Sequence, residues 1–301
     1  MLPATCSTLA FLPAASLLPT TDGGCPTSRI AYIHVPKAAG VSLFAALDGT
    51  SVPVCNHGTS LRDMGLHHEP CQCTECGARS HVAVAEQTHA WMRHTLFDEQ
   101  GWGGCAVWAA LVREPREWFY SAVGQWCAGL GGQQHHPACE TDSGRFANVS
   151  QLRSWGFFEK NGAGVEFSHR RLQPGEVKYY FQAPNLQSLM LGGALQEPDH
   201  IVCALPQRAR LLEAIRGLVG GAPPLAADAH ANEAHWDRID EWRAAVPWSD
   251  VEEFYREDQR LWDRVSNAPG GCVLTATRSR LAQVVPDDHD AQVKREEGAT
   301  G

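Results

Sequence analysis

The sequence has few of the features that mark a membrane-spanning or nucleic-acid-binding protein. It contains no uninterrupted apolar run of about 18 residues, the length that a membrane-spanning helix requires. Basic residues are not in excess, since 25 lysines and arginines stand against 34 aspartates and glutamates. The formal net charge of −9 argues against a protein that neutralises many phosphates of DNA or RNA. We therefore expect neither a transmembrane helix nor a nucleic-acid partner.

The N-terminal segment lacks the pattern of an intact targeting sequence. It is apolar, but three prolines interrupt it and no basic residue precedes the apolar run. Proline breaks helices and a secretory signal peptide begins with positive charge, so the segment fits neither a membrane helix nor a regular signal peptide. We interpret residues 1–28 as a tail, either a degenerate leader or an incomplete start.

Cysteine, in contrast, is abundant. Eleven cysteines suit a chain that folds in an oxidising compartment, and the odd count leaves at least one thiol free or paired between chains. The glycosylation sequon Asn148-Val149-Ser150 agrees with this interpretation. Cys127 and Cys139 bracket a segment of 13 residues and are predicted to form a disulfide that closes a short loop.

Residues 51–80 are rich in cysteine, histidine, glycine and proline and show no period, so we expect an irregular insertion there. It contains four cysteines at close spacing: Cys55, Cys71, Cys73 and Cys76. A tetrahedral zinc site needs four such ligands, but only one C-x₂-C pair is present. Disulfides are the favoured interpretation, with structural zinc as the alternative; the prediction assigns no metal site.

Apolar runs of strand length alternate with helical patterns along the chain. The predicted strands cover residues 29–35, 81–85, 106–112, 177–182 and 199–205. This alternation predicts an α/β fold with a parallel sheet and helices on both of its faces. We expect one domain over residues 29–270 and a C-terminal tail over residues 271–301.

The first motif is "YIHVPKAAGVSL", in which a strand passes through small residues into a helix. Backbone amides at such a junction, together with the helix dipole, attract an anion. Lys37 adds a positive charge there and Ser42 a hydroxyl. The nucleotide-binding pattern GxxxxGK[ST] is absent, because the lysine precedes the glycine.

The second motif is "VREPREWFYSAV", which places Arg113 directly after the apolar run 106–112 and Ser121 in the helix that follows. Ligands of parallel sheets bind outside the carboxyl ends of the strands. Lys37 and Arg113 are thus expected to flank one ligand that carries two anionic groups. A local ion pair between Arg113 and Glu114 is the alternative interpretation.

The two motifs together resemble those of the sulfotransferases that use 3′-phosphoadenosine 5′-phosphosulfate (PAPS). "PKAAGVSL" is similar to their 5′-phosphosulfate loop and "VREPREWFYSAV" to their 3′-phosphate segment, and "NLQSLMLGG" is similar more loosely. The membrane-associated carbohydrate sulfotransferases of the secretory pathway, in particular the uronyl 2-O-sulfotransferases, are the most similar branch. The resemblance implies a single sulfotransferase domain with a P-loop-like sheet and a location in the Golgi lumen or elsewhere in the secretory pathway.

The resemblance also implies the roles of particular residues. The PAPS-binding set is Pro36, Lys37, Ala38, Ala39, Gly40, Val41, Ser42, Arg113 and Ser121. Lys37 would neutralise charge on the leaving oxygen, and amides of residues 38–42 would hold the 5′-phosphate. His81 is the implied base, with His89 and Glu86 as competitors. Ala38, Ala39 and Val41 depart from the usual loop pattern, which removes hydroxyl groups but no backbone donors.

The expected partner is a glycan or glycoconjugate with a hydroxyl acceptor. The basic residues among 145–180 form the predicted acceptor patch: Arg145, Arg153, Lys160, Arg170, Arg171 and Lys178. Two other functions stay open at this point. One is a kinase-like phosphotransferase with an aberrant phosphate loop, and the other is a catalytically inactive, cysteine- and histidine-rich binding module on the same fold.

Overall fold

A computed structural model describes residues 29–38, 54–57, 82–85, 88–94, 96, 106–127, 139, 146–154, 158, 184–219 and 237–275. The strands are β1 (Arg29–Ile33), β2 (Val54–His57), β3 (Val82–Ala85), β4 (Ala106–Val112), β5 (His200–Ala204) and β6 (Cys272–Thr275). The α-helices are α3 (His89–Arg93), α4 (Pro115–Cys127), α5 (Val149–Ser154), α6 (Leu186–Leu191), α7 (Arg208–Val219), α8 (Ile239–Ala245) and α9 (Arg256–Ser266). The 3₁₀ turns are η6 (Ala194–Gln196), η7 (Leu205–Gln207), η8 (Trp248–Asp250), η9 (Glu252–Tyr255) and η10 (Pro269–Gly271).

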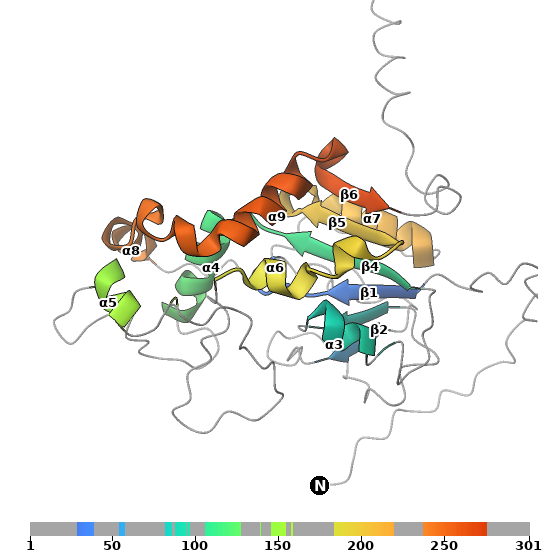
Figure 1. The fold of residues 1–301 in the computed structure, drawn as a ribbon, viewed down its shortest axis with the longest axis horizontal. Coiled ribbons are helices and arrows are strands. Elements are labelled where there is room, and N and C mark those ends of the chain that lie inside the picture. The colour runs from blue at the N-terminus through green and yellow to red at the C-terminus, as the bar shows by residue number, and fades with distance from the viewer. Residues whose placement is uncertain are drawn as a thin grey trace, which may run out of the picture.

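The strands form one sheet in the order β2-β3-β1-β4-β5-β6 (Figure 1). All neighbours from β2 to β5 run parallel. Strand β4 lies inside the sheet and all seven of its residues are buried, which is the environment that its unbroken apolar sequence predicts. The register pairs Ile33 of β1 with Ala110 of β4, so the chain leaves both strands at the same edge of the sheet.

Helices cover both faces of the sheet, which confirms the α/β class. Helix α7 packs on β1, β4 and β5 and lies behind the sheet in Figure 1, whereas α9 packs on β5, β6 and α6 in front of it. Apolar side chains from these helices meet the strands, and Leu211 and Ile215 of α7 are fully or almost fully buried. Within the described residues, no helix is long and apolar enough to cross a membrane.

The C-terminal boundary predicted at residue 270 is wrong, because the sheet continues to Thr275. Strand β6 pairs antiparallel with β5, which makes the sheet mixed where a parallel one was expected. Gly270 and Gly271 precede β6 with φ values of 63° and 65°. Glycine adopts this left-handed region without a Cβ penalty, so the pair of glycines turns the chain back along β5.

One local prediction also needs correction. Strand β2 lies within the segment 51–80 that was expected to be irregular. Residues 248–266 do not form one continuous helix: they contain η8, η9 and α9, and α9 begins only at Arg256. The predicted strand 177–182 lies outside the described residues.

The disulfide predicted between Cys127 and Cys139 is confirmed. A second one, which the sequence analysis did not anticipate, joins Cys203 in β5 to Cys272 in β6. These two residues are direct partners in the antiparallel register, so the bond crosses from the edge strand to its neighbour. Cys71, Cys73 and Cys76, for which disulfides were also expected, lie outside the described residues.

The sequon asparagine is exposed at the start of α5. The Asn148 side-chain oxygen accepts a hydrogen bond from the Gln151 amide at 2.9 Å, and the Gln151 side chain accepts one from the Asn148 amide at 3.0 Å. This reciprocal pair is a capping box, which satisfies amides that the first turn of a helix leaves without partners.

Candidate functional site

Lys37 lies in a tight turn directly after β1. The Ala38 amide donates to the Val35 carbonyl at 3.1 Å, which closes a four-residue turn with Pro36 in its second position and Lys37 in its third. Lys37 has a φ of 64°, a value for which such turns normally use glycine. A side chain in this left-handed region costs about 1–2 kcal/mol, and such strain persists only where the surroundings hold it.

The second motif supplies those surroundings. The Trp118 indole nitrogen of α4 donates to the Pro36 carbonyl at 2.7 Å. The Arg113 guanidinium donates to the Lys37 carbonyl at 3.2 Å. Two successive carbonyl groups of the turn are therefore held by residues that follow β4. The structure thus brings Lys37 and Arg113 together, as expected for two strand ends at one edge of the sheet.

The electrostatics of this edge favour an anion. Burial, and then the nearby Arg113, lower the pKa of Lys37 to about 8. Burial, and then Lys37, lower the pKa of His34 to about 4, so His34 stays neutral at pH 7. Within the part of the chain that the structure describes, no carboxylate pairs with the Lys37 ammonium group. The Lys37 ammonium group and the Arg113 guanidinium, held at the same edge of the sheet, attract an anion to this place.

The Glu114 carboxylate caps the helix that follows it. Its side chain accepts a hydrogen bond from the Glu117 amide at 2.8 Å and so caps the N-terminus of α4. Ser121 is half-buried on α4, one turn beyond Trp118. Because residues three apart share one side of a helix, Ser121 lies on the side from which Trp118 reaches the turn.

The Ala38 amide, which was expected to hold the 5′-phosphate, donates to Val35 within the turn. Backbone donors for an anion would therefore begin after Ala38. The remaining loop residues Ala39, Gly40, Val41 and Ser42 and the candidate bases His81 and Glu86 lie outside the described residues.

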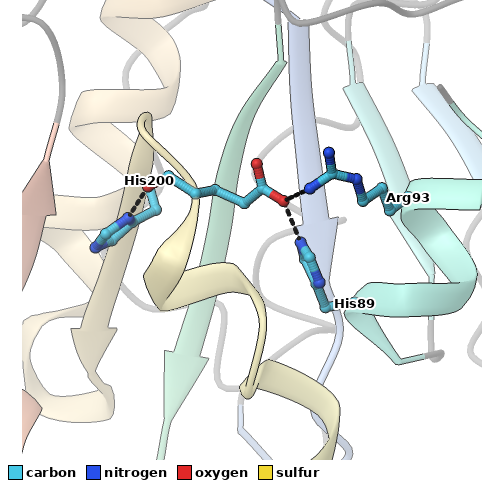
Figure 2. A network of polar contacts seen from close by, with 4 residues as sticks. His89, Arg93 and His200 are labelled. Atoms are coloured by element: carbon cyan, nitrogen blue, oxygen red, sulfur yellow. Dashed lines mark hydrogen bonds and ion pairs between the residues drawn. The ribbon is translucent and has the colours of Figure 1, made fainter.

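His89, a competing candidate for the base, pairs with Glu197 and packs against Trp108. Its Nε2 lies 2.9 Å from a Glu197 carboxylate oxygen, to which Arg93 also donates. Figure 2 shows His89 and Arg93 directed at this shared carboxylate. The His89 ring is buried and tilts against Trp108 at a centroid distance of 4.3 Å. Burial lowers the pKa of His89, although Glu197 opposes this effect. The ring thus joins α3 to the segment before β5.

His89 packs against the middle of the sheet rather than against the strand ends. Trp108, which it contacts, pairs with Ala31 in the middle of β1 rather than at the edge where Lys37 and Arg113 lie. His89 is therefore not among the residues that the structure brings to the Lys37–Arg113 site.

Gly193 provides a test of this packing role. A Cβ atom at Gly193 would lie 2.1 Å from the His89 Nδ1 atom, so the ring has to move for any side chain to fit. We expect Gly193→Ala to destabilise the protein by about 1–3 kcal/mol, as crowding of a packed interior does. Urea unfolding measures the change. Gly124→Ala is the control and is expected to cost less, because its added Cβ atom would lie 3.5 Å from Ile239, an ordinary contact distance.

The only described member of the predicted acceptor patch is Arg153, which lies among acidic residues. Its guanidinium pairs with Glu253 at 2.8 Å. It lines an open cavity of about 560 Å³ between α5 and the 3₁₀ turns η8 and η9. Asp250 and Glu252 line the same cavity, which makes this part of the surface more acidic than basic. Lys160, Lys178 and the other members lie outside the described residues.

Comparison with known proteins assigns no family to the chain. No family model, no curated protein and no solved structure matches it. Functional inference therefore depends on the residues and geometry of the site.

Two residues of this site, Trp118 and Gln187, were not expected from the sequence. Gln187 bonds through its side chain to both backbone groups of Arg113, at 2.8 and 2.9 Å. A signal for Trp118 was present, because it follows Arg113 within the same quoted motif. Gln187 lies in the "NLQS" stretch, whose function no local pattern discloses.

Proposed function

We propose that the protein is a PAPS-dependent sulfotransferase that transfers a sulfuryl group to a carbohydrate hydroxyl. The observation that carries this proposal is the contact between the two motifs. Arg113 donates a hydrogen bond to the Lys37 carbonyl, and Trp118 donates one to the Pro36 carbonyl. A ligand with anionic groups at both its 5′ and 3′ positions matches two cations held at one edge of a sheet. The similarity of both motifs to those of PAPS-dependent enzymes supports the same choice.

The chemistry requires little covalent participation by the protein. The acceptor oxygen attacks the sulfur, the bond between sulfur and the bridging phosphate oxygen breaks, and 3′,5′-adenosine bisphosphate leaves. Negative charge grows on the bridging oxygen during this step. The Lys37 ammonium group would stabilise this charge, and Arg113 with Ser121 would hold the 3′-phosphate, so that catalysis consists mainly of positioning and electrostatics.

The acceptor proton needs a base, and His81 is the candidate that the resemblance implies. His81 precedes Val82, which pairs with Ile30 at the amino end of β1, whereas Glu86 follows Ala85, which pairs with Ile33 at the carboxyl end that leads to Lys37. The register therefore favours Glu86 as the base that we propose. A base of this kind contributes about 10²–10⁴-fold to the rate. We further propose a glycan or glycoconjugate as the acceptor and the Golgi lumen as the location. The two disulfides fit an oxidising compartment.

A binding experiment tests the proposal directly. Isothermal titration calorimetry should show that the protein binds 3′,5′-adenosine bisphosphate at least tenfold more tightly than 5′-AMP, because only the bisphosphate engages Arg113. ATP with Mg²⁺ is the comparison for a kinase. Equal affinity for the bisphosphate and 5′-AMP, or tighter binding of ATP–Mg²⁺, would contradict the proposal.

The kinase alternative has little support at the described strand end. Such an enzyme needs a carboxylate there to hold a metal ion, and the chain supplies Arg113 followed by Glu114, whose carboxylate caps α4. A nucleotide-binding protein without transfer activity is the stronger second candidate. The structural role of His89 favours it, since one of the candidate bases is committed to packing. It predicts bisphosphate binding with no sulfate transfer to any glycan tested.

A further inference from the structure

The backbone of Arg113 is held by a side chain that is distant in sequence. The Arg113 amide donates to Gln187 Oε1 at 2.8 Å, and Gln187 Nε2 donates to the Arg113 carbonyl at 2.9 Å. The last ladder pair between β4 and β5 joins Val112 to Ala204, so Arg113 follows the last residue that the neighbouring strand pairs. The side-chain amide of Gln187 therefore bonds these groups as a neighbouring strand would. Gln187 is only 1% exposed. Without it, two backbone groups beside the buried strand would lose their partners.

Gln187 is itself held by the junction of α6 and α9. One Asp258 carboxylate oxygen accepts from the Ser188 amide and the Ser188 hydroxyl, each at 2.7 Å, and the other accepts from the Gln187 amide at 3.4 Å. In the reverse direction, the Asn185 side chain accepts from the amides of Glu257 and Asp258 at 2.9 and 3.2 Å. Each helix thus caps the first turn of the other, which fixes the position from which Gln187 reaches Arg113.

The chain of contacts ends at the anion site. Asp258 orients Gln187, Gln187 fixes the Arg113 backbone, and the Arg113 guanidinium reaches the Lys37 carbonyl at 3.2 Å. A charged group that recognises a ligand loses much of its effect when it is displaced by about 1 Å.

We propose that Gln187 is a positioning residue that gives the site its preference for a nucleotide with a 3′-phosphate. The inference rests on the proposed function, because it assigns Arg113 to that phosphate. Gln187 itself does not touch the ligand. It sets the location of the guanidinium and so determines how strongly the site distinguishes 3′,5′-adenosine bisphosphate from 5′-AMP.

The test uses Gln187→Met, which keeps the length of the side chain and removes both hydrogen bonds. Calorimetry should show bisphosphate binding weakened by roughly ten- to hundredfold, while the affinity for 5′-AMP changes less than about twofold. Gln196→Met, at an exposed glutamine in η6, is the matched control and should leave both affinities unchanged. In an Arg113→Ala background, Gln187→Met should have no further effect on bisphosphate binding.

A readout without nucleotide separates this inference from the proposed function. The Arg113 side-chain Nε–H signal in the NMR spectrum, identified by its loss in Arg113→Lys, should be sharp in the wild type and broadened or shifted in Gln187→Met. If the wild type does not distinguish the bisphosphate from 5′-AMP, the proposed function fails. If it does so and Gln187→Met retains both the preference and the sharp signal, the positioning role is wrong.

Ser188→Ala covers the case in which Gln187→Met does not fold. This variant removes one donor to Asp258 and leaves Gln187 in place, so it perturbs the same contacts more gently. We expect the preference for the bisphosphate to fall about two- to fivefold. An unchanged preference in folded Ser188→Ala protein, with an unchanged Arg113 signal, would overturn the inference.

Discussion

Lys37→Gly should bind 3′,5′-adenosine bisphosphate about ten- to hundredfold more weakly than the wild type and yet unfold at the same or a higher urea concentration. The affinity falls because the charge is lost. The stability is retained because glycine relieves the left-handed backbone at φ 64° and removes a partly buried ammonium group. Calorimetry and urea unfolding measure the two effects on the same protein.

Lys37→Arg and Lys37→Ala are the matched variants. Arginine keeps the charge, so it should retain more of the affinity than glycine does. Alanine loses the charge but keeps the strained backbone, so it should bind as weakly as glycine and be less stable than Lys37→Gly by about 1 kcal/mol. Full bisphosphate affinity in either uncharged variant would remove Lys37 from the site.

The pH dependence of the same site follows from the lowered pKa of Lys37. Bisphosphate affinity should fall as the pH rises above about 8, because the free protein then loses the positive charge that the ligand requires. In Lys37→Arg the fall should be absent up to pH 10. The stability of the fold changes in the opposite sense. In the unfolded chain Lys37 keeps its proton up to about pH 10, whereas in the folded protein it loses this proton from about pH 8. Between about pH 8 and 10 the free energy of unfolding therefore rises with pH. A flat affinity profile between pH 7 and 10 would contradict the assignment.

Removal of the disulfide between Cys203 and Cys272 should have the largest effect on stability. The two residues are separated by 69 positions, and closing a loop of that size in the unfolded chain corresponds to about 4 kcal/mol in the chain-entropy account. The double variant Cys203→Ala, Cys272→Ala should unfold at a markedly lower urea concentration than the wild type.

The other disulfide provides the comparison. Cys127 and Cys139 are separated by 12 positions, for which the same account gives about 3 kcal/mol. Their double alanine variant should therefore lose less, by about 1 kcal/mol. Reduced wild-type protein distinguishes loss of the bond from loss of side-chain volume in the buried pair. Equal stability of the Cys203–Cys272 variant and the wild type would show that the bond does not constrain the chain.

The parts of the structure that the sequence predicted are those that depend on neighbouring residues. The apolar run of β4, the proline that opens α4 and the cysteines of the short loop all signal their structure within a few positions. The common edge for Lys37 and Arg113 followed from the parallel arrangement of β1 and β4. Each of these predictions needed only local sequence and one topological rule.

The contacts that were missed join residues that are far apart in the chain. Gln187 lies 74 positions from Arg113, and Glu197 lies 108 positions from His89. The buried position of His89 follows from Gly193, whose missing side chain leaves room for the ring. The polar side chains of Gln187 and His89 look like surface residues in the sequence, because nothing local indicates the partner that permits their burial.

Strand β6 has a further consequence for how the molecule is made. It pairs with β5 across a separation of about 70 residues, so ribosomal synthesis exposes the open side of β5 for a period before its neighbour exists. An unpaired strand edge of this kind recruits other chains. Because the covalent link then secures the late-arriving strand, recombinant production in an oxidising host should yield monodisperse material, whereas a reducing host should favour inclusion bodies.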